Sequence, residues 1–324
     1  AARDAAARTR AHELAAASAR QGGVPASEPK PEHSRGVAAV FAGLLLAMFV
    51  STLSETVTAT ALPTIVGDLG GVDHMQWVTT AYILASTVMM PIYGKLGDLF
   101  GRKYLFIIAL SIFIVGSATC GLAPSMDGLI AGRAVEGLGG GGLIILAQAT
   151  IADIIPPRQR GKYMGLMGSV FAVSTVVGPL LGGWFVQVTG WRWLFAFNIP
   201  LALLAIAAVA FFLTKPVRRD DRPPIDIGGM MAMAVSVSSL VLATAWGGTL
   251  FPWISPQIFA LFALFFVAAV AFVLVERKAK EPIIPMLLFK NRNFVVCTVT
   301  GMFIMLGMMG TISYLPTYFQ IVEG

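Results

Sequence analysis

Long apolar stretches, separated by short polar segments, run through most of this 324-residue chain. Each stretch approaches the about 20 residues that an α-helix needs to cross the hydrocarbon core of a bilayer. The pattern predicts nine membrane-spanning helices, at about 37–61, 76–94, 104–123, 127–151, 162–186, 195–214, 228–248, 255–275 and 295–320. The predicted fold class is therefore an all-α integral membrane protein.

Composition and charge support this class. Hydrophobic residues make up 56% of the chain and charged residues 12%, whereas a soluble domain carries about 25% charge. The net charge of +6 does not predict a nucleic-acid partner, because the basic residues lie in short loops rather than on one folded face. Lys and Arg gather in the N-terminal tail and after every second span, so these segments are expected to be cytoplasmic. Residues 1–36 are polar and predict a disordered cytoplasmic tail.

The residues that enzymes and metal sites use are scarce in the spans. Cys120 and Cys297 lie in different predicted spans, and the histidines all lie outside them. The sequence therefore predicts no metal site, no cofactor and no enzyme. A membrane sensor or scaffold without transport is also not favoured, because the chain shows no soluble domain and carries charge inside its spans.

Three charged residues fall inside predicted spans: Glu55, Arg133 and Glu136. An intramembrane charge costs about 2.5–3.5 kcal/mol on insertion scales, so each marks a candidate functional site. Arg133 and Glu136 are three residues apart on one helix face and can pair with each other or share Glu55, which is expected at the same depth. The cluster could be a buried clamp between two spans or a site where a carboxylate binds and releases a proton. We favour Glu55 as that carboxylate.

A charged, glycine-rich decapeptide, residues 94–103, separates the second and third spans. Its glycines permit a very short turn, and three basic residues would keep that turn in the cytoplasm, namely Lys95, Arg102 and Lys103. Asp153 and Arg160, near the inner end of the fourth span, are expected to join Asp98 and Arg102 in a charge cluster. The alternatives are a loop that only fixes topology and a solvated pair worth little.

The decapeptide resembles, almost letter for letter, the loop between the second and third spans of major facilitator superfamily transporters. Residues 53–63 are similar to a signature of the fourteen-span drug:proton antiporter branch, in which many members carry the acid where Ser54 stands. Residues 133–139 resemble that family's proton-coupling motif Arg-x-x-Gln-Gly-x-Gly, with Glu136 in place of Gln. Residues 178–183 match its antiporter motif.

The resemblance implies a role for each of these stretches. It implies proton coupling by Glu55, Arg133 and Glu136. It further implies a conformational latch formed by Gly94, Asp98, Gly101, Arg102, Lys103 and Asp153. A hinge in the fifth span would consist of Gly178, Pro179, Gly182 and Gly183.

The resemblance also implies a domain order and an activity. Residues 37–214 would form the first six-helix half, 215–275 a cytoplasmic loop and two linker helices, and 276–324 a loop and the first helix of the second half, with the rest missing. The implied function is multidrug efflux by a proton-driven antiporter of hydrophobic or amphipathic small molecules. The expected setting is a bacterial plasma membrane, where the protein acts as a monomer that contributes to antibiotic resistance. The alternative is a dedicated lipid or secondary-metabolite exporter of the same fold.

Overall fold

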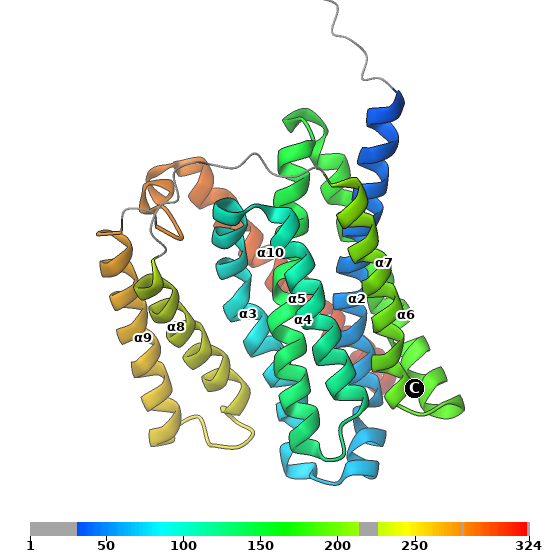
Figure 1. Cartoon of the computed structure of the whole chain (residues 1–324). Coiled ribbons are helices and arrows are strands. Elements are labelled where there is room, and N and C mark those ends of the chain that lie inside the picture. The colour runs from blue at the N-terminus through cyan, green and yellow to red at the C-terminus, as the bar shows by residue number, and fades with distance from the viewer. Residues whose placement is uncertain (1–30, 214–225, 280–281, 323–324) are drawn as a thin grey trace, which may run out of the picture.

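The computed structural model describes residues 31–213, 226–279 and 282–322, and within them helices are joined by turns and short irregular segments, with an isolated bridge between Gly247 and Phe251 (Figure 1). Its elements are α2 (Pro31–Leu69), η1 (Val72–His74), α3 (Met75–Phe100), α4 (Arg102–Gly121), α5 (Met126–Ile154), α6 (Pro157–Val188), α7 (Arg192–Phe212), α8 (Ile227–Trp246), α9 (Pro256–Glu276), η2 (Met286–Lys290) and α10 (Arg292–Val322). The structure confirms the predicted all-α class.

Helix α2 is longer at both ends than predicted. It begins at Pro31, so residues 31–36, which we predicted as tail, are helical; the fixed φ of proline suits the first position of a helix. It also continues through Pro63 to Leu69, because the helices of a membrane protein tolerate a proline whose lost hydrogen bond is made good locally. The rest of the predicted tail lies outside the described residues.

The decapeptide between the second and third spans is mostly helix rather than loop. Helix α3 runs on to Phe100 and α4 begins at Arg102, so Gly101 alone joins them. Its φ of 91° and ψ of 132° lie in a region that residues with a Cβ rarely adopt. A single glycine therefore makes the whole turn, and the charged residues on both sides of it are held on rigid helix ends.

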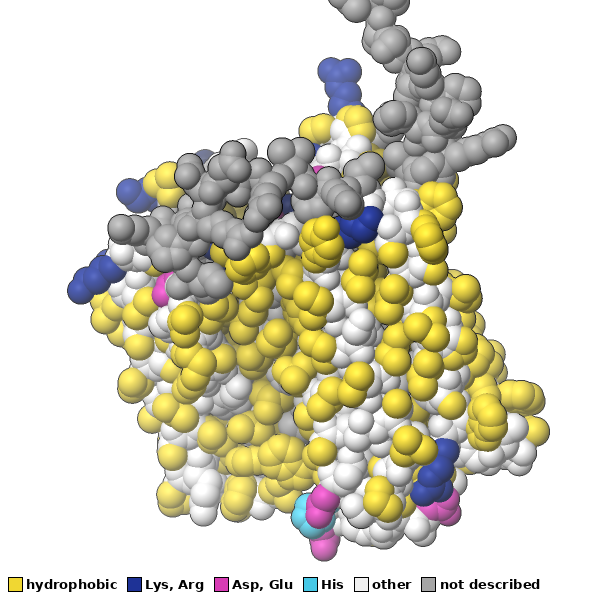
Figure 2. All heavy atoms as spheres, in the orientation of Figure 1, with side chains coloured by type: hydrophobic (Ala, Val, Ile, Leu, Met, Phe, Trp, Pro, Cys, Tyr) yellow, Lys and Arg dark blue, Asp and Glu magenta, His cyan; other side chains and the backbone are white. Residues whose placement is uncertain are grey.

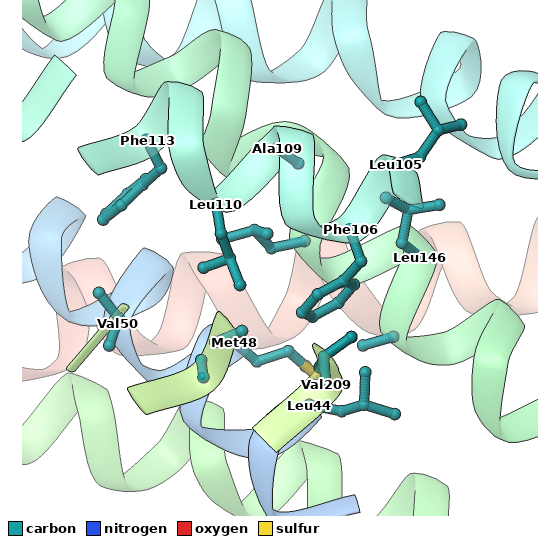
Figure 3. Packing of buried hydrophobic residues seen from close by; sticks show 14 of the residues in the cluster. Leu44, Met48, Val50, Leu105, Phe106, Ala109, Leu110, Phe113, Leu146 and Val209 are labelled. Atoms are coloured by element: carbon teal, nitrogen blue, oxygen red, sulfur yellow. The ribbon is translucent and has the colours of Figure 1, made fainter. Parts of the chain in front are cut away.

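Helices α2 to α7 pack into a bundle in which α5 lies against both α3 and α4, while α2 contacts α5, α6 and α7 (Figure 1). Figure 3 shows part of the core, where α2, α4, α5 and α7 meet through buried side chains that include Met48, Phe106, Leu110, Leu146 and Val209. In lipid such contacts stabilise the bundle mainly through close packing, because the surrounding acyl chains are as apolar as the core.

Seven of the described helices are long and apolar enough to cross a membrane, namely α2 from Ala38 and α4 to α9. We predicted nine spans. The other two, α3 and α10, are helical but miss this standard within the described residues: α3 carries several hydroxyl side chains and a charged C-terminal end, and the stretch of α10 that could be assessed, Arg292–Met308, is shorter than the other spans. Hydrophobic side chains cover the middle of the face in Figure 2, and Lys and Arg gather near one end. The chain is thus a multi-pass membrane protein.

Helices α8 and α9 form a hairpin that packs against α3 beside the bundle (Figure 1). The rings of Trp77 on α3 and Trp246 on α8 meet edge to face, with their centroids 5.4 Å apart. Between α3, α5 and α8 lies a mostly apolar groove of about 540 Å³, and Trp77 is one of the residues that line it. The hairpin therefore contacts the bundle through α3 in particular.

Candidate functional site

A buried ion pair lies on α5. Arg133 Nη1 is 2.6 Å from Glu136 Oε2, and both side chains are fully buried. The pair sits in a glycine-rich helix that remains regular, because a backbone in lipid must satisfy its own hydrogen bonds. Burying two charges is costly unless further hydrogen bonds satisfy their remaining donors and acceptors. The neighbours of this pair therefore decide whether it can exist.

Three other helices supply donors to the second oxygen of the carboxylate. Glu136 Oε1 accepts hydrogen bonds from Ser54 Oγ of α2 at 2.8 Å, Ser117 Oγ of α4 at 2.6 Å and Asn198 Nδ2 of α7 at 3.5 Å. Each of these residues is itself buried. The negative charge of Glu136 is thus fully compensated by one cation and several dipoles.

The guanidinium of Arg133 is equally well occupied. Its Nη1 donates to Ser54 Oγ at 3.1 Å and its Nε to the carbonyl of Val78 at 3.4 Å. Its Cζ lies 4.2 Å from the centroid of the Tyr82 ring, a cation–π contact with α3. Ser54 therefore donates to the carboxylate and accepts from the guanidinium.

Glu55 lies next to this cluster without joining it. Its side chain is partly buried and interacts electrostatically with Arg133, but no hydrogen bond or ion pair joins it to another residue that the structure describes. We predicted that Arg133 pairs with Glu136 or shares Glu55, and the structure shows the pair with Glu136. Ser54, which directly precedes Glu55, contacts Arg133. Glu55 and Arg133 therefore lie at a similar level along the bundle, as the sequence predicted.

Sequence analysis missed three members of the cluster, Tyr82, Ser117 and Asn198. Asn198 is a lone amide in an apolar span, and that is a signal that could have found it, whereas Tyr82 and Ser117 lie among other hydroxyl residues of their spans and give no such signal. Their convergence on Arg133 and Glu136 depends on which faces of α3, α4, α5 and α7 meet. A single helix pattern does not contain that information.

A second cluster of charges joins α3, α4 and α5 at the end of the bundle that holds the decapeptide. Arg102 Nη2 donates to Asp98 Oδ1 at 3.0 Å, and its Nη1 forms an ion pair with Asp153 Oδ2 at 2.6 Å that is not aligned as a hydrogen bond. The side chains of Asp98 and Asp153 are 58% and 62% exposed. The structure thus brings together three of the four charged residues of the predicted latch, Asp98, Arg102 and Asp153.

The remaining latch residues lie around this charge cluster. Lys103 Nζ donates to the carbonyls of Ala210 and Leu213, at 2.7 and 2.6 Å, where α7 ends. Gly94 packs near Ile145 of α5, and Gly101 forms the turn. Lys103 therefore satisfies terminal carbonyls of α7 and ties α4 to it.

Arg160 does not join this cluster, contrary to our expectation. Its guanidinium donates to the carbonyl of Ile155, at 3.0 Å, and to that of Ala152. These carbonyls lie at the end of α5, where unsatisfied acceptors and the helix dipole attract a cation. A nearby helix terminus is thus a better partner for Arg160 than a carboxylate that Arg102 already occupies.

The predicted hinge in α6 forms a close contact with α2. A Cβ on Gly178 would overlap the Thr56 hydroxyl, and one on Gly182 would lie 3.1 Å from Thr60 Cβ. One turn before Gly178, the Ser174 hydroxyl accepts a hydrogen bond from Thr52 at 2.8 Å. A row of small residues on α6 therefore faces a row of threonines on α2, which is how membrane helices approach closely.

The other two predicted hinge residues are placed differently. Pro179 lies inside α6 without ending it. A Cβ on Gly183 would meet nothing within 4 Å, so this glycine is not needed for the contact between α2 and α6. The motif thus combines two glycines with a packing role and one without.

Comparison with known proteins agrees with this architecture. The sequence is 44% identical over 284 residues to "Multidrug transporter protein MdtP" of Bacillus subtilis (strain 168), covering 87% of this chain and 52% of the relative. It is 41% identical over 290 residues to "Multidrug resistance protein 3" of the same organism, covering 88% and 56%. The chain thus spans about half the length of the curated relatives it matches.

A solved structure shares the fold. The crystal structure of an auto inhibited POT family peptide transporter superposes with a TM-score of 0.51 at 16% identity, over 72% of this chain and 51% of that one. At this identity the likeness concerns the fold alone. The sequence profile described as Major Facilitator Superfamily matches residues 44–324. The resemblance noted in the sequence is confirmed, and the chain belongs to the major facilitator superfamily.

Proposed function

We propose that this protein is a proton-coupled exporter of hydrophobic or amphipathic small molecules. One observation carries the proposal: Glu55 is a partly buried carboxylate without a hydrogen-bond or ion-pair partner among the described residues, next to an Arg133–Glu136 pair that is fully buried and hydrogen-bonded to its neighbours. The names of the two Bacillus subtilis relatives support the class of substrate.

The division of roles follows from the partners of each carboxylate. Protonating Glu136 would weaken its ion pair with Arg133 and its hydrogen bonds from the neighbouring hydroxyls, leaving a buried cation uncompensated. Protonating Glu55 breaks no contact of this kind. Glu55 is therefore the carboxylate that can change its charge during a cycle, while Arg133 and Glu136 remain a neutral unit that tunes its proton affinity.

Transport would follow the alternating-access scheme, in which two helical halves rock about a site near the bilayer midplane. Entry of a proton to Glu55 from the outside would accompany release of substrate there, and loss of the proton to the cytoplasm would accompany substrate loading. The cluster of Asp98, Arg102 and Asp153 would latch the cytoplasmic side, since its exposed ion pairs can break at little cost. The proton gradient supplies the free energy, so no cofactor is required.

The test is dye efflux by the full-length protein in proteoliposomes, with and without an imposed pH gradient. We expect several unrelated cationic and neutral dyes to move when the gradient is present. Glu55→Gln should abolish uphill, gradient-driven transport and keep downhill dye exchange, because it preserves side-chain shape but removes the titrating group. Asp127→Asn, at an exposed acid in the first turn of α5, is the matched control and should behave as the wild type.

Two outcomes would contradict the proposal. If Glu55→Gln pumped dye uphill at the wild-type rate, Glu55 would not carry the proton. If the intact protein moved no dye under a gradient, multidrug export would be wrong, and the lipid or secondary-metabolite exporter would become the hypothesis to test with those substrates.

A further inference from the structure

Tyr82 is a neighbour of both the Arg133–Glu136 pair and Glu55. It belongs to none of the predicted motifs. It is 3% exposed and sits on α3. Its hydroxyl lies 2.9 Å from Ser51 Oγ and also donates to the Ser51 carbonyl at 3.2 Å. The face of its ring covers the Arg133 guanidinium. Tyr82 therefore contacts α2 with its hydroxyl and α5 with its ring.

Two glycines of α5 make room for this residue, Gly140 for its side chain and Gly137 for its backbone. A Cβ on Gly140 would lie 2.5 Å from the Tyr82 hydroxyl oxygen, and one on Gly137 would lie 2.5 Å from the Tyr82 carbonyl oxygen. Both distances are far below ordinary van der Waals contact, so Tyr82 can pack this closely against α5 only with glycine at these positions. Two glycines of the glycine run in the fourth predicted span are thus explained by their close packing against one aromatic residue.

Glu55 lies on the face of α2 that Tyr82 contacts, one turn after Ser51. It interacts electrostatically with both Tyr82 and Arg133. The other titratable groups of this region are Glu136 and the Cys120 thiol of α4, which interacts with Glu136 and Arg133. From α6, the part that faces α2, residues 174–182, carries no titratable side chain. Arg133 is therefore the cation that competes for Glu55.

We propose that Tyr82 is a positioning residue that holds Arg133 against Glu136 and so keeps Glu55 free of an ion-pair partner and able to bind a proton. This inference rests on the proposed function. The ring occupies one face of the guanidinium, while Glu136, Ser54 and the Val78 carbonyl take its donors. Removing the ring opens the space beside Arg133 on the side of α2, and the guanidinium can then turn toward Glu55.

The sign of the effect follows from electrostatics. A cation within about 4–6 Å of a carboxylate favours its charged form. If Arg133 approached Glu55 in a variant without the ring, Glu55 would release its proton at lower pH than in the wild type. The pH at which proton-driven transport is half-maximal should then move to lower values.

The experiment compares Tyr82→Phe with Tyr82→Leu in the full-length protein, reconstituted in proteoliposomes, by measuring dye efflux as a function of pH. Tyr82→Phe keeps the ring over Arg133 and loses only the hydrogen bonds to Ser51, so its midpoint should stay close to the wild-type value. Tyr82→Leu removes the ring and should move the midpoint by about one pH unit to lower pH. A merely structural role would reduce the rate of both variants without moving the midpoint.

A second measurement covers the case in which Tyr82→Leu does not fold. In Tyr82→Met, a flexible apolar side chain keeps contacts with the surrounding helices but places no aromatic ring over the Arg133 guanidinium, and infrared difference titration follows the protonated carboxyl band that disappears in Glu55→Gln. A midpoint of this band that is lower in Tyr82→Met than in Tyr82→Phe supports the inference. Equal midpoints, or an unshifted efflux profile in an active Tyr82→Leu protein, overturn it while leaving proton coupling intact. Absence of gradient-driven efflux in the wild type would instead refute the proposed function.

Discussion

The molecule holds two arginine–carboxylate pairs of the same length in different surroundings. In each, an arginine Nη1 lies 2.6 Å from a carboxylate oxygen: Arg133 with Glu136 inside the bundle, and Arg102 with Asp153 at its end. The first pair has 1% and 0% of its side chains exposed, and the second 20% and 62%. The distance between the two charged atoms therefore does not by itself determine how much a pair contributes to stability.

Burial makes the difference. Removing one partner of a buried pair leaves an uncompensated charge and costs about 3–5 kcal/mol, whereas an exposed pair contributes about 0–1 kcal/mol and is screened by salt. A pair that must open in every transport cycle is better placed where breaking it is cheap. We therefore expect the Arg133–Glu136 pair to be a fixed part of the site and the Arg102–Asp153 pair to be able to switch.

The largest effect is expected from moving the buried negative charge. Glu136→Gln should destabilise the protein by about 3–5 kcal/mol, because Arg133 loses its counter-ion. Ser54→Asp in the same protein should restore most of this loss, since Ser54 Oγ already lies 3.1 Å from Arg133 Nη1. The measurement is a double-mutant cycle on unfolding in detergent.

The control for this cycle is Thr58→Asp combined with Glu136→Gln. Thr58 is also buried on α2, one turn after Ser54, but its hydroxyl bonds to the Ser54 carbonyl of its own helix. No rescue is expected there. If Ser54→Asp and Glu136→Gln were simply additive, the geometry assigned to the buried pair would be wrong.

The buried pair also shows what the sequence could predict. Charge within an apolar run is visible in one dimension, and a spacing of three residues places Arg133 and Glu136 on one face of α5. Helix positions followed from the apolar runs for the same reason, to within a few residues at most ends. Information that is local along the chain was therefore available.

Contacts that depend on how several helices pack together could not be predicted from the sequence. The donors of Ser117 and Asn198 reach Glu136 from α4 and α7. The sequence around neither residue indicates that its side chain contacts Glu136. Arg160 shows the same limit, because a local pattern does not decide between a carboxylate and the end of a helix as its partner. The extension of α3 through the decapeptide was missed because glycine generally weakens a helix. Close packing against neighbouring helices can keep such a segment helical.

An intermediate effect is expected at a site that is buried but uncharged. Gly178→Ala should destabilise the contact between α2 and α6 by about 1–3 kcal/mol, because the added methyl group overlaps the Thr56 side chain. Gly183→Ala, five residues further along the same helix and with open space around it, is the matched control and should be nearly neutral. Thermal unfolding of both variants in detergent gives the comparison.

The two glycine variants also separate sterics from helix propensity. Both replacements favour a helix intrinsically to the same extent, so the difference between them isolates the contact with α2. Equal stability of the two variants would mean that α6 moves away from α2 at no cost, and the proposed hinge would then lack the close contact assigned to it. The difference should not depend on salt, because no charge is involved.

The smallest effect is expected at the exposed pair, and salt makes it measurable. Asp153→Asn should lower the stability by at most about 1 kcal/mol at low ionic strength, and this loss should disappear in about 1 M salt, where the screening length is about 3 Å. The loss in Glu136→Gln should persist in the same salt, since solvent ions do not reach a fully buried group. A loss in Asp153→Asn that is large and independent of salt would show that the Arg102–Asp153 pair is as costly to break as the buried one. The two pairs would then not divide into a fixed unit and a switch, and the latch would need another element that opens at low cost.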